Sequence, residues 1–414
     1  METYAHIVGW GMYVPENIVT NDDLAKIVDT SDEWIRSRTG IRERRIATEK
    51  DTTASMAITA AREALDRARI NPADVDLVIV ATVTPEYPFP ATACLVQDAL
   101  GAKKAGAVDV NAGCSGFIYG LSLASGMIRS EQAKIAVVVG AETLSRITDW
   151  EDRTTCVLFG DGAGAVVLQA SEEPGGVLST VLGSDGGGGN YLVMPGGGSK
   201  NPASVETVKN RDHFIKMNGP EVYKFATRVM GRAAKEACEK ANIDLGDIDL
   251  FIPHQANARI IKSAAKYLKL DESKVFQNLQ HYGNTSSASV PIALCEAIQT
   301  GRVRDGDDLV LVGFGAGLTW GATVVKWGLP IPYQKRQKWY RGLRWVLYRW
   351  AQLSSRLNWF ILNIENRLAH RNIPSIPSIP YITEKEDPPQ KSSNGHNGHG
   401  KIEPEQTPEE PTEK

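Results

Sequence analysis

The chain repeats one of its own segments at an interval of 173 residues. Residues 63–79 (EALDRARINPADVDLVI) align without a gap with residues 236–252 (EACEKANIDLGDIDLFI), and eight of these 17 positions are identical. The same interval places residues 137–140 (VVVG) on residues 310–313 (VLVG). A period this long exceeds the period of solenoid repeats. It therefore indicates two copies of one β/α unit that share a core.

Short apolar runs alternate with amphipathic helical patterns through residues 1–330. The clearest runs are 77–80, 135–139 and 309–312, and the clearest helical patterns span 53–69, 115–129, 219–241 and 256–268. Strands that are apolar on both faces favour a mostly parallel sheet with helices on both sides. The predicted fold class is therefore α/β.

Composition excludes several classes of protein. No run approaches 18 apolar residues, so we expect no transmembrane helix, and residues 1–20 lack the pattern of a secretory signal. The five Cys residues are an odd number scattered through 414 residues, which argues for a reducing compartment. We expect a cytoplasmic protein.

Cys114 is the first candidate for chemistry. It lies in Gly113-Cys114-Ser115-Gly116, between a predicted strand and a predicted helix. A thiol at a helix N-terminus lies near the positive end of the helix dipole, which favours the nucleophilic thiolate. The alternative is a buried structural cysteine. The other four cysteines lack the glycine-flanked turn.

The repeat links Cys114 to a second turn. Adding 173 places residues 111–115 (NAGCS) on residues 284–288 (NTSSA), so the two turns should face each other across a pseudo-two-fold axis. Asn284 offers an uncharged amide donor there, although a plain turn is the alternative. His254 follows the apolar run 250–252, at the carboxyl end of a predicted strand, where an open sheet places functional groups. The alternative is a core histidine whose ring is hydrogen-bonded within the protein. His281 competes with His254 but lies in a stretch that reads as irregular.

A glycine-rich segment, residues 313–321 (GFGAGLTWG), follows the last predicted strand pattern. It lacks the GxGxxG spacing and the P-loop lysine of nucleotide-binding loops. A backbone that approaches a substrate and offers N–H groups to an oxyanion fits this segment better. The His and Cys residues show no metal-ligand spacing, so we expect no metal site.

Seven motifs together carry a family resemblance. They are residues 30–35 (TSDEWI), 38–44 (RTGIRER), 111–116 (NAGCSG), 159–164 (FGDGAG), 253–257 (PHQAN), 283–286 (GNTS) and 313–320 (GFGAGLTW). Residues 3–328 resemble β-ketoacyl-acyl-carrier-protein synthase III, an initiating condensing enzyme of type II fatty-acid synthesis. Thiolases carry a second catalytic Cys in the last glycine loop, and elongating synthases replace the Asn with His, so neither fits. Plant-type polyketide synthases share Cys-His-Asn but differ in the flanking motifs.

This resemblance implies a thiolase-like fold. Two pseudo-two-fold-related halves form a five-layer α-β-α-β-α arrangement, with the nucleophile in residues 1–173 and the His and Asn in residues 174–331. It also implies decarboxylative condensation of an acyl-CoA primer with malonyl-acyl-carrier protein. Acetyl-CoA is the favoured primer. The primer and malonyl-acyl-carrier protein are substrates, and no cofactor is implied. The alternatives are a related acyl-Cys acyltransferase and a polyketide-priming synthase.

The resemblance also assigns roles to individual residues. The implied catalytic residues are Cys114, His254 and Asn284, and the implied oxyanion hole is formed by the backbone of Cys114, Gly315, Ala316 and Gly317. The implied CoA contacts are Trp34, Arg38, Arg153 and Asn257. Arg259 would bind the carrier protein, and Phe89 would reach the acyl pocket of the partner in a homodimer. No role with nucleic acid is implied.

Residues 332–414 are not explained by the resemblance. Residues 335–371 hold nine Lys and Arg against one acid, and apolar side chains recur at helical spacing through residues 339–364. A basic amphipathic helix over residues 332–371 is therefore predicted. Contact of residues 339–368 with a membrane surface and packing on the body or on a partner remain equal alternatives, and the first would make the chain a membrane-recruiting scaffold. Residues 372–414 are predicted to be a disordered acidic tail.

Overall fold

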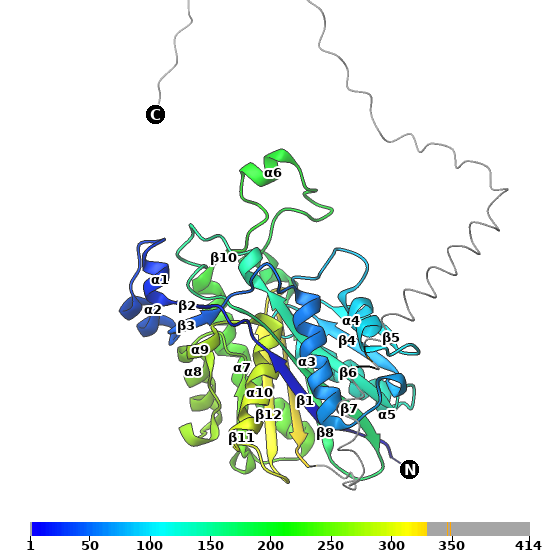
Figure 1. Ribbon diagram of the computed structural model, residues 1–414. Helices are drawn as coiled ribbons and strands as arrows, with labels where there is room; N and C mark the ends of the chain where they lie inside the picture. Colours follow the sequence, from blue (N-terminus) through cyan, green and yellow to red (C-terminus); the bar gives the residue numbers. More distant parts are fainter. Residues whose placement is uncertain (1, 329–345, 347, 349–414) are drawn as a thin grey trace, which may run out of the picture. The chain divides into compact units, whose positions relative to one another are not determined.

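The computed structural model describes residues 2–328 together with Val346 and Tyr348 (Figure 1). Two β-sheets dominate this part of the chain. The first has the strand order β1-β7-β6-β4-β5. Its strands are β1 (Tyr4–Tyr13), β4 (Leu77–Ala81), β5 (Gly106–Val110), β6 (Ile135–Thr143) and β7 (Asp161–Ser171).

The second sheet has the order β11-β12-β13-β8. Its strands are β8 (Gly176–Ser184), β11 (Leu250–Pro253), β12 (Asp308–Gly315) and β13 (Thr319–Lys326). The two sheets have the same strand order when β8 is matched with β1, β13 with β7, β12 with β6 and β11 with β4. An isolated parallel bridge between Phe251 and Val275 lies where the first sheet has β5. The repeat seen in the sequence is thus a repeat of strand order.

The expectation of mostly parallel sheets is wrong. β4 runs parallel to β5 and β6, and β11 runs parallel to β12. β7 is antiparallel to both β1 and β6, and β13 is antiparallel to both β12 and β8. Burial on both faces makes a strand apolar whatever its direction, so the apolar runs could not distinguish the two arrangements.

Three layers of helices alternate with the two sheets. One cluster of buried side chains joins α3 (Thr53–Ala68) and α4 (Thr92–Leu100) to the first sheet, and another joins α7 (Gly219–Ala241) and α8 (Ala258–Leu268) to the second. Between the sheets lie α5 (Gly116–Arg129) and α10 (Ser289–Gln299). β4 contributes to both sides, because Val78 and Val80 pack toward α3 and α4 while Leu77 and Ile79 pack toward α5. This is the expected five-layer α-β-α-β-α arrangement.

The repeated segment also ends its helices in the same way. α3 is followed by Arg69 with φ 57°, and α7 is followed by Asn242 with φ 54°. These two residues are 173 positions apart, and each closes its helix in the left-handed conformation. A short 3-10 turn follows in both cases, Pro72–Asp74 and Leu245–Asp247.

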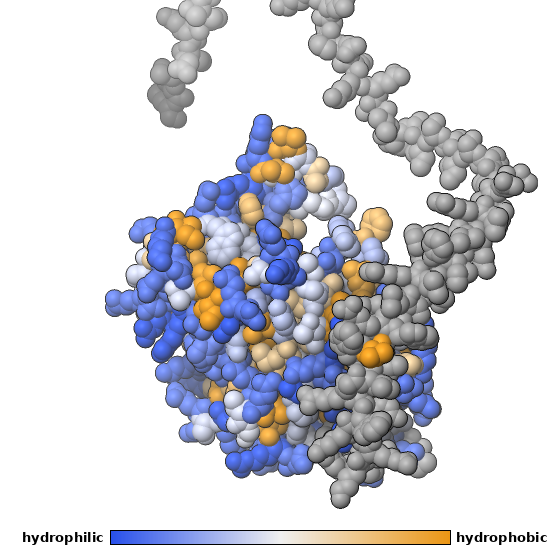
Figure 2. All heavy atoms as spheres, viewed as in Figure 1, coloured by the Kyte–Doolittle hydropathy of each residue, from blue (hydrophilic) through white to orange (hydrophobic). Residues whose placement is uncertain are grey.

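The remaining elements form smaller units around the two sheets. They are β2 (Ile18–Thr20), α1 (Asn21–Ala25), α2 (Asp32–Thr39), β3 (Glu43–Arg45), β9 (Leu192–Val193), α6 (Val205–Lys209), β10 (Lys216–Met217) and α9 (Leu279–Tyr282), with further 3-10 turns at Leu144–Arg146, Gly186–Tyr191, Glu272–Lys274 and Ser286–Ala288. Figure 2 shows apolar side chains over α6, where Val205 and Val208 are exposed. His281, expected in an irregular stretch, lies in α9.

Little of the C-terminal extension is described. Tyr348 is 9% exposed, and the guanidinium carbon of Arg62 on α3 lies 4.9 Å from its ring centroid. Val346, which belongs to the predicted apolar stripe, is 52% exposed. The rest of the predicted helix over 332–371 and the predicted tail over 372–414 lie outside the described residues. Among the helices that the structure describes, none is long and apolar enough to cross a bilayer.

The predicted domain boundaries remain predictions. The chain leaves the first sheet at the end of β7 and enters the second at the start of β8, and the predicted boundary at residues 173/174 falls in this connection.

Candidate active site

The turn that carries Cys114 lies between β5 and α5. It is held against the loop that follows β12, because the Ser115 hydroxyl lies 2.8 Å from the Thr319 hydroxyl and Thr319 donates to the Ala112 carbonyl at 2.7 Å. Gly315 permits this close approach, since a Cβ at that position would collide with the backbone nitrogen of Cys114. The N–H of Cys114 is thereby brought next to the turn of residues 315–317.

The Cys114 side chain is more enclosed than the sequence suggested. The residue is 8% exposed, and α5 begins two positions later, at Gly116. Burial raises the pKa of the thiol to about 12, and a hydrogen bond with the Ser286 side chain opposes this rise in part. The expectation of a resting thiolate is therefore wrong, because burial of the sulfur favours the neutral thiol. The resting group is a thiol at neutral pH.

His254 follows the last residue of β11 and is almost fully buried. Its backbone N–H donates to the Val312 carbonyl at 2.7 Å, and its Nδ1 lies 2.5 Å from the Ser289 hydroxyl. The ring meets that of Phe314 edge-on, with centroids 5.1 Å apart. Burial lowers the pKa of the imidazole to about 3, so His254 is neutral at pH 7.

Asn284 lies in the turn that follows α9. Its backbone N–H donates to the Leu158 carbonyl, and its own carbonyl accepts from the Gly160 N–H, so the residue is held on both sides of Phe159. Its side-chain oxygen accepts from the Ser286 N–H at 2.8 Å. The side-chain N–H₂ group is the part of this amide that remains to act as a donor toward a substrate.

Residues 284–289 connect the three predicted catalytic groups. Ser287 lies against Gly116 at the start of α5, Ser289 contacts His254, and Asn284 begins the segment. The two turns that the repeat relates, residues 111–115 and 284–288, therefore meet, as the sequence predicted. Ser287 and Ser289 were missed as participants, although both follow shortly after the recognised GNTS motif.

Glu142 was also missed. It lies on β6, is fully buried, and accepts hydrogen bonds from the hydroxyl groups of Ser287 and Thr84 and from the Val83 N–H. The repeat held a signal for it, because residue 142 corresponds to residue 315 at the interval of 173. Glu142 thus occupies, in one half, the position of the glycine that contacts Cys114 in the other.

The predicted CoA-binding residues surround Trp34 on α2. The guanidinium carbons of Arg38 and Arg153 lie 4.9 and 5.5 Å from its ring centroid. Asn257 caps α8 and donates to the Arg38 carbonyl at 3.1 Å, which joins α8 to α2. Arg259, one position inside α8, lies over the ring of Tyr223 at 5.4 Å. These predicted contacts thus lie on connected elements.

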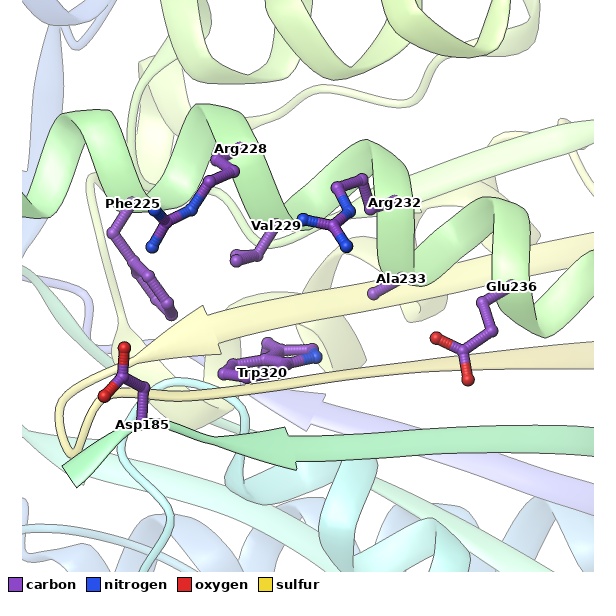
Figure 3. A pocket seen from close by; sticks show the side chains of 8 residues that line it. All are labelled: Asp185, Phe225, Arg228, Val229, Arg232, Ala233, Glu236 and Trp320. Atoms are coloured by element: carbon purple, nitrogen blue, oxygen red, sulfur yellow. The ribbon is translucent and has the colours of Figure 1, made fainter. Parts of the chain in front are cut away.

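A separate pocket of about 260 Å³ lies elsewhere, between α7 and the second sheet (Figure 3). It is lined by Asp185, Phe225, Arg228, Val229, Arg232, Ala233, Glu236 and Trp320. None of the predicted site residues is among them. Within the described residues, no three His, Cys, Asp or Glu side chains gather closely enough to hold a metal ion.

Two family models match parts of the chain. The 3-oxoacyl-[acyl-carrier-protein] synthase III model matches residues 108–186, and the model of the C-terminal part of this synthase matches residues 238–327. The first match contains Cys114 and the second contains His254 and Asn284.

Known proteins extend this match to the whole body. The β-ketoacyl-[acyl-carrier-protein] synthase III of Symbiobacterium thermophilum is 56% identical over 322 residues, which are 78% of this chain and 98% of that protein. The crystal structure of 3-oxoacyl-[acyl-carrier-protein] synthase III from Aquifex aeolicus is 49% identical, with a TM-score of 0.72 over 78% of this chain and all of that one. The priming β-ketosynthase of the R1128 polyketide pathway is 36% identical, with a TM-score of 0.74 over 80% of this chain and 98% of that one.

The fold and these matches define a condensing enzyme with the thiolase-like fold. The chain belongs to the β-ketoacyl-acyl-carrier-protein synthase III family.

Proposed function

We propose that this enzyme initiates fatty-acid synthesis by decarboxylative condensation of an acyl-CoA primer with malonyl-acyl-carrier protein. The proposal rests on one observation, which is that three segments of the chain contact one another around Cys114. The turn around Cys114 follows β5, residues 313–317 lie at the end of β12, and residues 284–289 join α9 to α10; these three segments touch one another. The names of the curated relatives support the same activity.

The first half of the reaction loads the primer. The Cys114 sulfur attacks the thioester carbonyl of acyl-CoA, the bond from that carbonyl carbon to the CoA sulfur breaks, and the thiol proton ends on the released CoA. The tetrahedral intermediate carries a negative oxygen. The N–H groups of Cys114 and of the Gly315–Gly317 turn, which Ala316 completes, would stabilise that oxygen.

The second half uses His254 and Asn284. Malonyl-acyl-carrier protein loses CO₂, and the resulting enolate carries its negative charge on the thioester oxygen. With the Ser289 hydroxyl donating to Nδ1, the neutral His254 keeps its proton on Nε2 and can donate it to that oxygen beside the Asn284 amide. The enolate carbon attacks the acyl group on Cys114, the carbon–sulfur bond breaks, and the thiolate regains a proton from solvent. Every bond change is supplied by Cys114 and the two thioesters, so the reaction needs no cofactor.

The group around Trp34 is the proposed CoA site. Arg153 already lies over the Trp34 ring and donates to the Asp29 carbonyl at 2.8 Å. An adenine ring stacked between Trp34 and Arg153 therefore requires Arg153 to move outward. Arg38 would meet the phosphates, and Asn257 would contact the pantetheine arm.

Arg259 is the proposed contact for the acidic acyl carrier protein. It lies at the start of α8, a helix that also carries Lys262, Lys266 and the cap residue Asn257. The positive charges on α8 would attract an acidic partner and orient its prosthetic arm toward the candidate active site.

A homodimer is the proposed assembly, with β5 at the contact. Among the described residues, β5 is the edge strand of the first sheet and pairs with β4 alone, and its Val108 is exposed. Phe89, in the loop between β4 and α4, is 86% exposed. An unpaired edge beside an exposed aromatic ring is a surface that a second copy would cover, and Phe89 would then reach the partner's acyl pocket.

A cytoplasmic location and contact of residues 339–368 with a membrane surface stay predictions. At the two described positions, Tyr348 packs on Arg62 while Val346 of the apolar stripe faces solvent.

The second candidate function is priming of a polyketide. The R1128 priming enzyme is 36% identical to this chain, against 56% for the relatives named β-ketoacyl-[acyl-carrier-protein] synthase III, so the first function has the stronger support. Both functions load a primer on Cys114, so the identity of the downstream carrier protein separates them.

The variant Cys114→Ala tests the proposal. We expect formation of the β-ketoacyl product to fall by a factor on the order of 10³ or more, because no acyl-enzyme forms. The measurement follows product and CO₂ with acetyl-, branched and longer acyl-CoA primers, which also identifies the preferred primer. Cys94→Ala, which removes an exposed thiol on α4, is the matched control and should retain activity. Condensation by Cys114→Ala at the rate of this control would refute the proposal, whereas residual malonyl decarboxylation would not.

A further inference from the structure

Arg44, on β3, is a fully buried side chain that the proposed reaction leaves unused. Its guanidinium donates to the Val19 carbonyl at 3.1 Å, and to the Asn21 side-chain oxygen and the Val157 carbonyl at 2.9 Å each. Burial lowers the pKa of this group to about 10, so it is a cation at neutral pH, yet none of these three partners is an acid. Burying such a charge costs free energy that an apolar side chain would not cost, so its three hydrogen bonds are what distinguishes arginine here.

Two of the three acceptors belong to the unit that carries the proposed CoA site. Val19 lies on β2 and Asn21 begins α1. The Asn21 side chain also donates to the carboxylate of Asp32, the first residue of α2, at 2.9 Å. Trp34 is on that same helix. Figure 1 shows β2, β3, α1 and α2 together at one side of the body, and Arg44 is bonded within this unit.

The third acceptor belongs to residues 157–160, which hold Asn284. The Asn284 N–H donates to the Leu158 carbonyl at 2.8 Å, and the Asn284 carbonyl accepts from the Gly160 N–H at 3.0 Å. The Val157 carbonyl, one residue before Leu158, is the acceptor bound by the buried guanidinium. The cation therefore fixes the segment that holds the backbone of the proposed catalytic amide.

The stem of Arg44 packs against the same two segments. A Cβ at Gly160 would lie 3.2 Å from the Arg44 Cβ, and a Cβ at Gly283 would lie 3.3 Å from it. Gly283 directly precedes Asn284 and has φ 65°, a conformation that favours glycine. Arg44 thus restrains the backbone on both sides of the bridge between Phe159 and Asn284.

The proposed role of Asn284 depends on where its amide lies. The side-chain oxygen accepts from the Ser286 N–H, so the N–H₂ group is the part that would reach the thioester oxygen of the substrate. A donor of this kind acts only over a narrow range of distance and angle, and a displacement of about 1 Å can cost roughly 10²-fold in rate. The segments that hold Asn284 therefore bear on the rate of the step that it serves.

We propose that Arg44 is a positioning residue, which fixes residues 157–160, and through them the Asn284 amide, to the unit of β2, β3, α1 and α2. This inference rests on the proposed role of Asn284 in stabilising the enolate. It assigns Arg44 no contact with substrate. A planar guanidinium suits the task, because it donates to three acceptors in different directions, whereas the ammonium of lysine is a compact charge.

A cycle of Arg44→Lys, Asn284→Ala and the double variant tests the proposal. The full chain receives saturating acyl-CoA and malonyl-acyl-carrier protein, and the rate of CO₂ release is measured, since the enolate forms in that step. Acylation of Cys114 by acyl-CoA alone is followed separately by mass spectrometry. Arg62→Lys is the matched control, because Arg62 is a half-buried arginine on α3 that donates to the Ala99 carbonyl at 2.8 Å.

We expect Arg44→Lys to slow CO₂ release by roughly 10-fold, because the Asn284 amide is displaced. In the Asn284→Ala chain the same substitution should change the rate by less than about 2-fold, since the group that it positions is already absent. Acylation of Cys114 does not use Asn284 and should keep its rate, as should both steps in Arg62→Lys. A full rate of CO₂ release in Arg44→Lys, or an equal loss with and without the Asn284 amide, would overturn the proposal.

Asn21→Ala gives a second reading if Arg44→Lys does not fold. It leaves Arg44 in place but removes one acceptor and the link to Asp32. CO₂ release should fall in the same direction by a smaller factor, roughly 3-fold, and again not in the Asn284→Ala chain. An unchanged rate in Asn21→Ala would overturn the link between Asn284 and the unit that carries α2.

Hydrogen exchange tests the same contacts without relying on activity. Peptides that contain the N–H groups of Asn284 and Gly160 should exchange faster in Arg44→Lys than in the unsubstituted chain, and Arg62→Lys should leave them unchanged. Unchanged exchange in Arg44→Lys would overturn the inference even in an active enzyme. Absence of CO₂ release from the unsubstituted chain would instead refute the proposed function.

Discussion

The two halves of the body place equivalent turns at its centre, yet only one turn holds a reactive group. In the first half the turn carries Cys114, and Gly315 of the other half lies against it. In the second half the equivalent turn carries Ser287, and Glu142, the counterpart of Gly315, lies against it. A missing side chain leaves backbone N–H groups beside Cys114, whereas a carboxyl group fills the corresponding space beside Ser287.

This difference shows how a duplicated fold becomes asymmetric in function. The two halves have the same strand order and the same left-handed residue after α3 and α7, because the packing of each half depends on these features. The residues at the carboxyl ends of the strands differ. One turn packs against a glycine, and the other is closed by hydrogen bonds from Ser287 to Glu142 and to the Ala81 carbonyl.

Among the variants that test this difference between the two turns, the largest expected effect comes from adding a side chain at Gly315. Gly315→Ala adds a Cβ that collides with the Cys114 backbone nitrogen. We expect kcat for condensation to fall by roughly 10² to 10³, the range for loss of an oxyanion-hole donor. Steady-state kinetics with a saturating primer measures this.

The matched control for that variant is Gly126→Ala. A Cβ at Gly126, inside α5, has no neighbour within 4 Å, and alanine favours a helix. This control should keep full activity. If Gly315→Ala matched it, the close approach of the two halves would have no role in catalysis.

A smaller effect concerns the pH dependence set by His254. Its pKa is about 3 in the folded protein and 6.5 in the unfolded chain, so the unfolded chain binds the extra proton between these values. The stability that neutral His254 contributes is complete above pH 6.5 and is lost as the pH falls toward 3, by at most roughly 1.4 kcal/mol per pH unit. Denaturant unfolding from pH 7.5 to 4.5 should therefore show a shallower loss for His254→Asn than for the unsubstituted chain.

His281→Asn is the control for this comparison, because it removes a half-exposed imidazole on α9. Its curve should follow that of the unsubstituted chain. Parallel curves for His254→Asn and the unsubstituted chain would show that burial does not hold His254 neutral.

The smallest expected effect tests the extension against the body. Tyr348→Ala removes the ring that lies on Arg62, and we expect a loss of about 0.5 to 1 kcal/mol in the free energy of unfolding. Val346→Ala, at an exposed position two residues away, should change it by less than about 0.5 kcal/mol. If the two variants had equal free energies of unfolding in denaturant, the contact between Tyr348 and Arg62 would not stabilise the protein.

Much of the fold was predictable because its signals are local or repeated. The apolar runs at 77–80, 135–139 and 309–312 became β4, β6 and β12, and the helical pattern at 219–241 became α7 with the same bounds. The interval of 173 residues predicted that the turns at Cys114 and Asn284 would meet. Strand direction was not predictable, since a strand buried on both faces is apolar in either direction.

The ionisation of the site was the least predictable part. Position at a helix start suggested a thiolate for Cys114, but the surrounding layers desolvate the sulfur and raise its pKa to about 12. Glu142 gave no local sign of a role, because a single acid at the end of an apolar strand is indistinguishable from a surface charge. Only its place opposite Ser287 reveals what it contacts.

The sequence by itself determined the family, the duplication and the identity of the candidate catalytic groups, because these depend on residue types and their spacing. The tertiary structure decided which charges those groups carry and which neighbours support them. Desolvation and hydrogen-bond geometry arise only when segments that are distant in the sequence pack together, as residues 284–289 do here with β6 and with the Cys114 turn, both more than 100 residues earlier. The interval of 173 residues predicted that two equivalent turns would meet, and the packing around them set the burial of Cys114 in one turn and the hydrogen bonds of Ser287 in the other.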